Sequence, residues 1–132
     1  MHHYIKIRGA ISIPYLKIQI NQDFDEEKKG EIMDKISKLV AKELGKPESM
    51  IMVALETATK MVFGGTNEPT IFMELKSVGL PESITSDLSE SLCDFAEQHL
   101  NVKKERIYIE FTNAVKSMFG WKGKNILELF PD

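Results

Sequence analysis

The sequence predicts a single α/β domain of two tandem β-α-β units, which form a four-stranded mixed sheet with both helices on one face. The first observation is the order of the patterns, because alternation typical of a strand, spacing typical of a helix and a second strand pattern occur twice. The second is an internal match of residues 44–53 with residues 100–109, each with a leucine-ended helix, a polar turn and an apolar strand. Two right-handed crossovers of this kind place both helices on the same face of one sheet.

The first unit opens with a strand over residues 14–20, in which every second residue is apolar. Asp23, with Glu26 three residues later, resembles a capping box that opens a helix. Apolar residues then recur at helical spacing, and Gly45 stands where a glycine ends such a helix. The apolar run over residues 50–55 predicts the second strand.

The second unit follows a loop over residues 63–69, which is marked by two glycines and a proline. Alternation over residues 70–78 predicts the third strand. A helix is expected to begin near residues 81–83, and the fourth strand is expected over residues 106–111. From Phe119 onward the pattern predicts an irregular C-terminal segment.

The sheet face that carries no helix is expected to be covered by other subunits. The predicted strands hold apolar residues on both sides, and a large exposed apolar surface marks an interaction site. The pattern therefore predicts an oligomer, without fixing the number of subunits.

Composition excludes several classes of function. The formal net charge of −3 argues against a sequence-independent nucleic-acid binder, and no apolar run is long enough for a transmembrane helix. Cys93 is alone, which excludes an internal disulfide and a thiolate metal cage. A cytoplasmic location is expected from this cysteine usage and the lack of a signal-peptide pattern, while secretion without a signal peptide stays open. His2, His3 and His99 have no metal-ligand spacing, so no metal is expected.

Six short marks occur in a defined order and spacing. They are Pro14 at the start of a strand, Gly45-Lys46-Pro47, the sequence GGTNEP over residues 64–69, Ser77-Val78-Gly79, the sequence RIYI over residues 106–109, and Gly120-Trp121. From Pro14 to about Ile126 the chain thus resembles the macrophage migration inhibitory factor family of the tautomerase superfamily. The resemblance implies a homotrimer of three sheets around a central axis. It also implies cofactor-free keto–enol tautomerisation of a small α-keto acid such as phenylpyruvate, which is an isomerase reaction.

In that family an N-terminal proline supplies the catalytic base through its free amine. A lysine is a poor base at neutral pH, because its pKa lies near about 10.4. An α-amine starts at about 7.7 to 8.0, and an apolar pocket lowers its pKa further by disfavouring the cation. The resemblance therefore assigns the role of base to Pro14. The structural alternative is a proline that only begins a strand.

The resemblance implies further roles. Lys46 would bind the substrate carboxylate, the Val78 N–H that follows Ser77 would donate a hydrogen bond, and Tyr108 would come from the neighbouring subunit. Lys46 can also be explained as a cation near a helix C-terminus, and Tyr108 as a half-buried strand residue. The positions that line the aromatic pocket in the family are Tyr15, Met50, Phe119 and Trp121.

Some positions depart from the family pattern. Glu110 stands near the pocket mouth, where the mammalian family member has an asparagine, and would repel an anionic substrate unless it turns away or is paired with a cation. Ile126 replaces a phenylalanine that closes the pocket. Thr70 and Met73 replace the two cysteines of a Cys-x-x-Cys motif, which excludes a dithiol oxidoreductase activity.

Residues 1–13 precede the predicted tautomerase-like domain of residues 14–132. An amide-bonded proline nitrogen has no basic lone pair, so the explanation for residues 1–13 decides whether Pro14 can act as a base. Three explanations are open: the native protein starts just before Pro14, the extension is cleaved after Ile13, or the extension is retained and residues 4–8 add an alternating strand to the sheet. In the third case Pro14 cannot abstract a proton.

Two other functions stay open for the same chain. One is a non-catalytic or cytokine-like binding protein, although no residue supports receptor binding. The other is a related reaction at the same site, such as dopachrome isomerisation or decarboxylation.

Overall fold

The computed structural model describes residues 11–132. Its elements are β1 (Ile13–Ile20), α1 (Glu26–Leu44), β2 (Met52–Glu56), β3 (Ile71–Val78), α2 (Thr85–Leu100), β4 (Ile107–Ala114), β5 (Gly120–Trp121), β6 (Lys124–Asn125) and α3 (Ile126–Leu129). The strand predicted over residues 4–8 lies outside the described residues. Within residues 11–132, no helix is long and apolar enough to cross a membrane.

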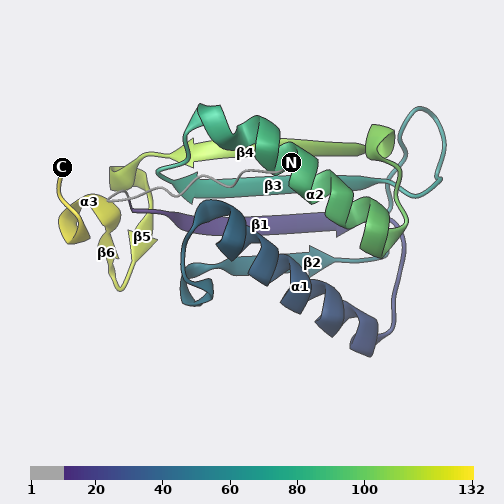
Figure 1. Cartoon of the computed structure of the whole chain (residues 1–132), viewed down its shortest axis with the longest axis horizontal. Helices are drawn as coiled ribbons and strands as arrows, with labels where there is room; N and C mark the ends of the chain where they lie inside the picture. The colour runs from purple at the N-terminus through teal and green to yellow at the C-terminus, as the bar shows by residue number, and fades with distance from the viewer. Residues whose placement is uncertain (1–10) are drawn as a thin grey trace.

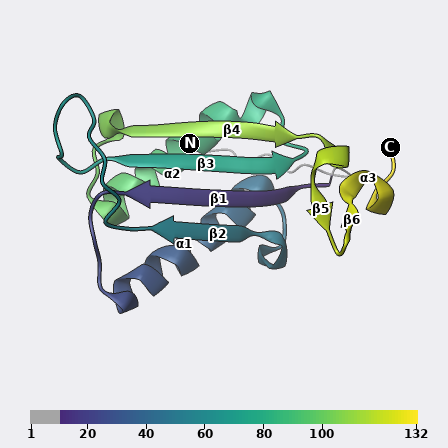
Figure 2. The same cartoon turned by 180° about the vertical axis from the view of Figure 1, so that it is seen from behind.

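The four long strands form one sheet in the order β2-β1-β3-β4. β1 is parallel to β2 and antiparallel to β3, while β3 is parallel to β4. Each parallel pair is connected through one helix, and α1 and α2 both cover the same face (Figure 1). Figure 2 shows the opposite face, over which no helix lies. The predicted mixed sheet of two β-α-β units is confirmed.

The core lies between the sheet and the two helices. Leu16, Ile18 and Ile20 of β1 are fully buried because they point toward the helices, while their neighbours in sequence point away. Burying each such side chain stabilises the fold by about 1.5–3 kcal/mol. The helices cover the sheet with Ile32, Ile36, Val40 and Leu44 from α1 and Leu88, Leu92, Phe95 and Leu100 from α2.

In both units the helix ends in the same kind of turn. Gly45 after α1 and Asn101 after α2 adopt left-handed conformations, with φ angles of 64° and 55°. A 3₁₀ turn follows in each unit, Glu48–Met50 in the first and Lys104–Arg106 in the second, and then β2 or β4 begins. The internal match predicted from the sequence is confirmed, down to the conformation of its turn residues.

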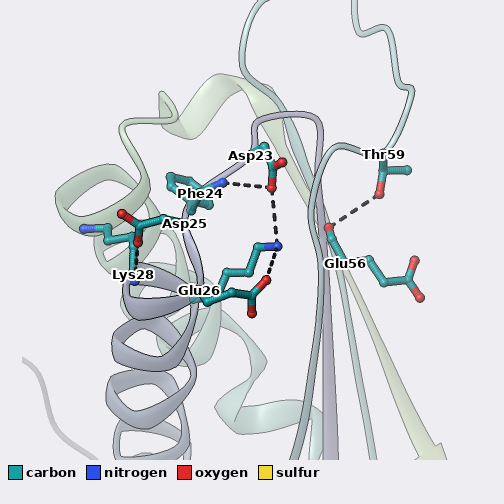
Figure 3. A network of polar contacts seen from close by, with 8 residues as sticks. Asp23, Phe24, Asp25, Glu26, Lys28, Glu56 and Thr59 are labelled. Atoms are coloured by element: carbon teal, nitrogen blue, oxygen red, sulfur yellow. Dashed lines mark hydrogen bonds and ion pairs between the residues drawn. The ribbon is translucent and has the colours of Figure 1, made fainter.

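The start of α1 differs from the prediction (Figure 3). Asp25, not Asp23, is the N-cap, and its carboxylate accepts a hydrogen bond from the backbone N–H of Lys28 at 2.8 Å. Asp23 instead accepts from the N–H of Phe24 at 2.9 Å and lies 3.5 Å from the ammonium of Lys29. The predicted capping box is therefore wrong, because two acidic residues within three positions offer competing caps and the path of the chain selects the second.

The C-terminal segment is more regular than predicted. β5 and β6 form an antiparallel hairpin, and its two loop residues, Lys122 and Gly123, both have positive φ angles, as a type I′ turn requires. α3 follows with a capping box, since the Asn125 side chain accepts from the N–H of Glu128 at 2.8 Å and the Glu128 side chain accepts from the N–H of Asn125 at 3.0 Å. A Lys-Gly loop is a weaker turn signal than Asn-Gly, so the hairpin was missed.

The sheet face without helices is less apolar than predicted. Lys17 of β1 pairs with Glu56 of β2 at 3.3 Å, and Lys76 lies 3.7 Å from Glu74 on β3. Apolar residues on this face are interspersed with these ion pairs, so the expectation of two strongly apolar faces is wrong. Burial of apolar surface is therefore not a sufficient reason for this face to be covered.

Candidate active site

A cavity of about 300 Å³ lies at one end of the sheet, where three separate segments meet. The start of β1, the turn that leads into β2 and the C-terminal hairpin enclose it. Its lining residues are Ile13, Pro14, Tyr15, Ser49, Met50, Ile51, Met52, Phe119, Gly120 and Trp121. Larger hollows are found elsewhere. One of about 650 Å³ beside residues 58–62 contains none of the predicted site residues, and one of about 810 Å³ along the C-terminal hairpin shares Phe119 and Trp121 with this cavity.

The cavity gathers five of the predicted site residues from distant parts of the chain: Pro14, Tyr15, Met50, Phe119 and Trp121. The sequence did not single out Ile13, Ser49, Ile51 or Met52 as site residues, and Gly120 was noted only as part of the Gly120-Trp121 mark. Their only signal is adjacency to Pro14, Met50 and Trp121, which is too weak to separate a lining residue from an ordinary strand residue.

No Asp, Glu, His, Lys or Arg side chain lines this cavity among the described residues. The walls are mainly aromatic, aliphatic and thioether groups, and the polar side-chain groups are the hydroxyls of Tyr15 and Ser49 and the indole N–H of Trp121. Such walls suit an apolar or aromatic ligand body. Neither hydroxyl is a base at neutral pH, so the side chains that line the cavity supply no general base.

Residues 11–13 are built into the sheet beside Pro14. Ile13 lies opposite Val78 in the register between β1 and β3. Ser12 is buried, and its hydroxyl is 3.1 Å from the hydroxyl of Ser77, which also donates to the Val78 carbonyl at 2.9 Å. The Ile13–Pro14 peptide bond leaves the Pro14 nitrogen without a basic lone pair, and the segment in front of it occupies the position next to Val78.

Ser77, Val78 and Ile126 are placed around the cavity without lining it. Ser77 and Val78 are buried, and Val78 instead lines a second hollow of about 390 Å³ together with Ile11. Ile126 is fully buried, and its backbone N–H donates to the Phe119 carbonyl at 2.9 Å. Ile126 therefore holds the hairpin that carries Phe119.

Three further predicted residues do not line this cavity within one chain: Lys46, Tyr108 and Glu110. Lys46 follows α1, where its backbone N–H donates to the Ala41 carbonyl at 3.0 Å, and it does not line the cavity. Tyr108 pairs in register with Phe72, five positions along β3 from Ser77, which is roughly 17 Å at about 3.3 Å per residue. The Tyr108 side chain is 63% exposed, so a single chain cannot bring it to its own cavity but leaves it accessible to another.

Glu110 lies on β4, next in register to Glu74 of β3, on the sheet face without helices. It is exposed and does not line the cavity of its own chain. Within residues 11–132, no group of three or more His, Cys, Asp or Glu side chains is placed to hold a metal ion.

The chain is similar to proteins of one family along most of its length. The family model described as Macrophage migration inhibitory factor (MIF) matches residues 13–127. The macrophage migration inhibitory factor homolog of Brugia malayi is 35% identical over 92 residues, which cover 69% of this chain and 80% of that protein. The homolog of Trichinella spiralis is 34% identical over 94 residues, covering 70% of this chain and 82% of that protein.

Solved structures agree with the sequence matches. The crystal structure of the macrophage migration inhibitory factor homologue from Prochlorococcus marinus superposes with a TM-score of 0.78 at 34% identity, covering 85% of this chain and 98% of that one. The factor from Trichinella spiralis superposes with a TM-score of 0.77 at 29% identity, covering 84% and 98%. Both the fold and the sequence of the domain are thus similar to those of these proteins.

Proposed function

Because the chain belongs to the macrophage migration inhibitory factor family, whose members are tautomerase- or isomerase-like, we propose that it is a cofactor-free keto–enol tautomerase of α-keto acids such as phenylpyruvate. The activity depends on a free amine at Pro14. The observation that carries the proposal is the apolar cavity that contains Pro14 and no charged side chain.

The reaction needs one base and one hydrogen-bond donor. The Pro14 amine takes a proton from the carbon beside the carbonyl, and the electron pair of that C–H bond forms the C=C bond of an enolate. The electrons of the C=O π bond move onto the oxygen, which takes a proton from water and becomes an enol, and the protonated Pro14 amine returns its proton to water. An amine in an apolar cavity has a pKa below the ordinary α-amine value, because desolvation disfavours the cation. General-base catalysis of this kind contributes typically about 10²–10⁴-fold to the rate.

The remaining polar groups come from outside the cavity of one chain. Homologues in the family form oligomers, and in such an assembly the exposed Tyr108 of one subunit is available to the cavity of another. In the proposed site Lys46 binds the substrate carboxylate, and the Val78 N–H donates to the substrate once the segment in front of Pro14 is absent.

The test compares three N-termini. A chain that begins at Pro14 should convert phenylpyruvate, followed by the absorbance of the enol, and Pro14→Gly in this chain should lower the rate by about a hundredfold. In a matched chain with one alanine in front of Pro14, the proline nitrogen is an amide, so this chain should be inactive. Equal rates with and without the alanine would exclude Pro14 as the base. Intact-mass measurement of the natural protein decides which form the cell makes.

A second candidate function is binding without catalysis. Residues 11–13 support it, because Ser12 is buried against Ser77 and Ile13 is paired with Val78. If the natural protein keeps these residues, it should fail to turn over phenylpyruvate and still bind an aromatic carboxylate. Turnover by a chain that retains Ile13 would count against this alternative.

A further inference from the structure

Arg106 makes an unusual number of contacts with one loop. Its guanidinium donates to the backbone carbonyls of Pro69 at 2.9 Å, Phe63 at 3.1 Å, Glu68 at 3.0 Å and Thr66 at 3.4 Å. All four acceptors lie in the loop of residues 63–69, between β2 and β3. The planar fork of an arginine can serve several carbonyls at once, which a lysine ammonium does not reproduce.

The loop needs such an anchor. Gly64 and Gly65 have positive φ angles and no atom within 4 Å of where a Cβ would lie, so no packing restrains them. The loop backbone pairs with itself through hydrogen bonds between Phe63 and Thr66, at 3.0 and 3.2 Å, and the Asn21 side chain donates to the carbonyls of Asn67 and Glu68 at 3.1 and 3.0 Å. The Arg106 contacts therefore supply a large part of the order in this loop.

The anchored loop contacts Tyr108 through the side chain of Phe63. The Arg106 guanidinium lies 5.2 Å from the centroid of the Phe63 ring, and the Phe63 and Tyr108 rings meet edge to face with their centroids 4.9 Å apart. Arg106, Phe63 and Tyr108 thus form one continuous stack at the end of the sheet that is remote from the cavity of the same chain. Without Phe63 in this position, the exposed Tyr108 ring has greater freedom to rotate.

We propose that Arg106 is a positioning residue for ligand binding: it fixes the loop of residues 63–69 and, through Phe63, the orientation in which Tyr108 is presented to the cavity of a second copy of the chain. This inference rests on the proposed function, since it takes Tyr108 as a group that contacts ligand across subunits. Arg106 itself does not touch the ligand.

The internal repeat supports a specialised role for this position. Arg106 ends the 3₁₀ turn before β4, and its counterpart in the first unit is Met50, which ends the equivalent turn before β2 and lines the cavity. The two equivalent positions therefore lie at opposite ends of the sheet, Met50 at the cavity and Arg106 beside Tyr108. In one unit the side chain forms a cavity wall, and in the other it orders the loop next to Tyr108.

The test uses the full chain and a probe that cannot react. Trp121 is the only tryptophan and lines the cavity, so its fluorescence reports binding of 3-phenylpropanoate, an aromatic carboxylate without a keto group. Arg106→Lys should weaken binding about fivefold, the loss expected for about one hydrogen bond. Tyr108→Phe should weaken it as well, and Arg106→Lys should have no further effect in the Tyr108→Phe chain. Lys103→Gln, at an exposed lysine three residues away, is the matched control and should leave affinity unchanged.

Equal effects of Arg106→Lys with and without the Tyr108 hydroxyl would overturn the proposal, because a merely structural role weakens both chains alike. Failure of the full chain to bind the probe would also overturn it. The proposed tautomerase function fails separately, when a chain that begins at Pro14 shows no turnover. The binding cycle does not depend on proton transfer, so the two failures are distinguishable.

Discussion

Gly79→Ala should destabilise the full chain by about 2–3 kcal/mol, and Gly123→Ala by about 1–2 kcal/mol. Both glycines have nearly the same left-handed conformation, with φ angles of 73° and 75°. Replacing either with alanine introduces the same conformational strain and the same change in the entropy of the unfolded chain. The difference in unfolding free energy between the two variants therefore reports the contacts that surround Gly79.

The surroundings differ in one contact. A Cβ at Gly79 would lie 2.1 Å from the carbonyl oxygen and 3.3 Å from the carbonyl carbon of Ile11, whereas nothing lies within 4 Å at Gly123. Because the obstacle is backbone, residues 11 and 12 must move away. That movement breaks the hydrogen bond between Ser12 and Ser77, which accounts for the additional loss of about 1 kcal/mol.

The assay is urea unfolding followed by circular dichroism, at one protein concentration because an oligomer's stability depends on concentration. In a chain that begins at Pro14, the extra loss at Gly79 should disappear, since the obstacle is gone. Equal losses for the two alanine variants in the full chain would refute the packing of Ile11 against Gly79, and with it the embedding of the segment in front of Pro14.

Three further predictions concern the helices. Asp25→Ala should lower the free energy of unfolding in urea by about 1 kcal/mol, because it removes the acceptor of the Lys28 N–H. Asp25→Ser should recover most of this loss, and equal losses in the two variants would contradict the capping role. The pKa of His99 in an NMR titration should lie below the ordinary histidine value, first because burial disfavours the cation and then because Lys35 and Lys28 repel it. Its contribution to stability is therefore complete above about pH 6.5 and is lost as the pH falls through the lowered folded pKa, and a raised midpoint would contradict this environment. Burial raises the pKa of the Cys93 thiol, so a disulfide reagent at neutral pH should label it more slowly than it labels a free small thiol, and an equal rate would exclude the burial.

Much of the fold could be predicted because its signals are local. Alternation in β1 and helical spacing in α1 are properties of consecutive residues, and Gly45 marks the end of α1 by its own conformational freedom. The start of α1 could not be predicted to the residue, since Asp23 and Asp25 are both suitable caps. The β5–β6 hairpin was missed because two-residue strands carry almost no periodicity.

The candidate site was predicted less completely than the fold. Resemblance pointed to Pro14, Met50 and Trp121, and the structure brings these together although they are far apart in the sequence. Lys46 and Tyr108 do not line this cavity within one chain, and Tyr108 lies at the far end of the sheet, so its predicted role requires the assembly. No pattern in the sequence indicated the stack of Arg106 on Phe63, because its contacts cross some forty positions of the chain.

The sequence by itself determined the two β-α-β units, the core they share and the family resemblance, because each is encoded in the order and spacing of neighbouring residues. Only the tertiary structure decided how the residues in front of Pro14 are held. The hydroxyls of Ser12 and Ser77, 65 positions apart, meet because β1 and β3 pair antiparallel, and that pairing extends to Ile13. The nitrogen of Pro14 is therefore an amide within the sheet in this chain. It can act as a base only if the Ile13–Pro14 peptide bond, which joins two residues of β1, is absent.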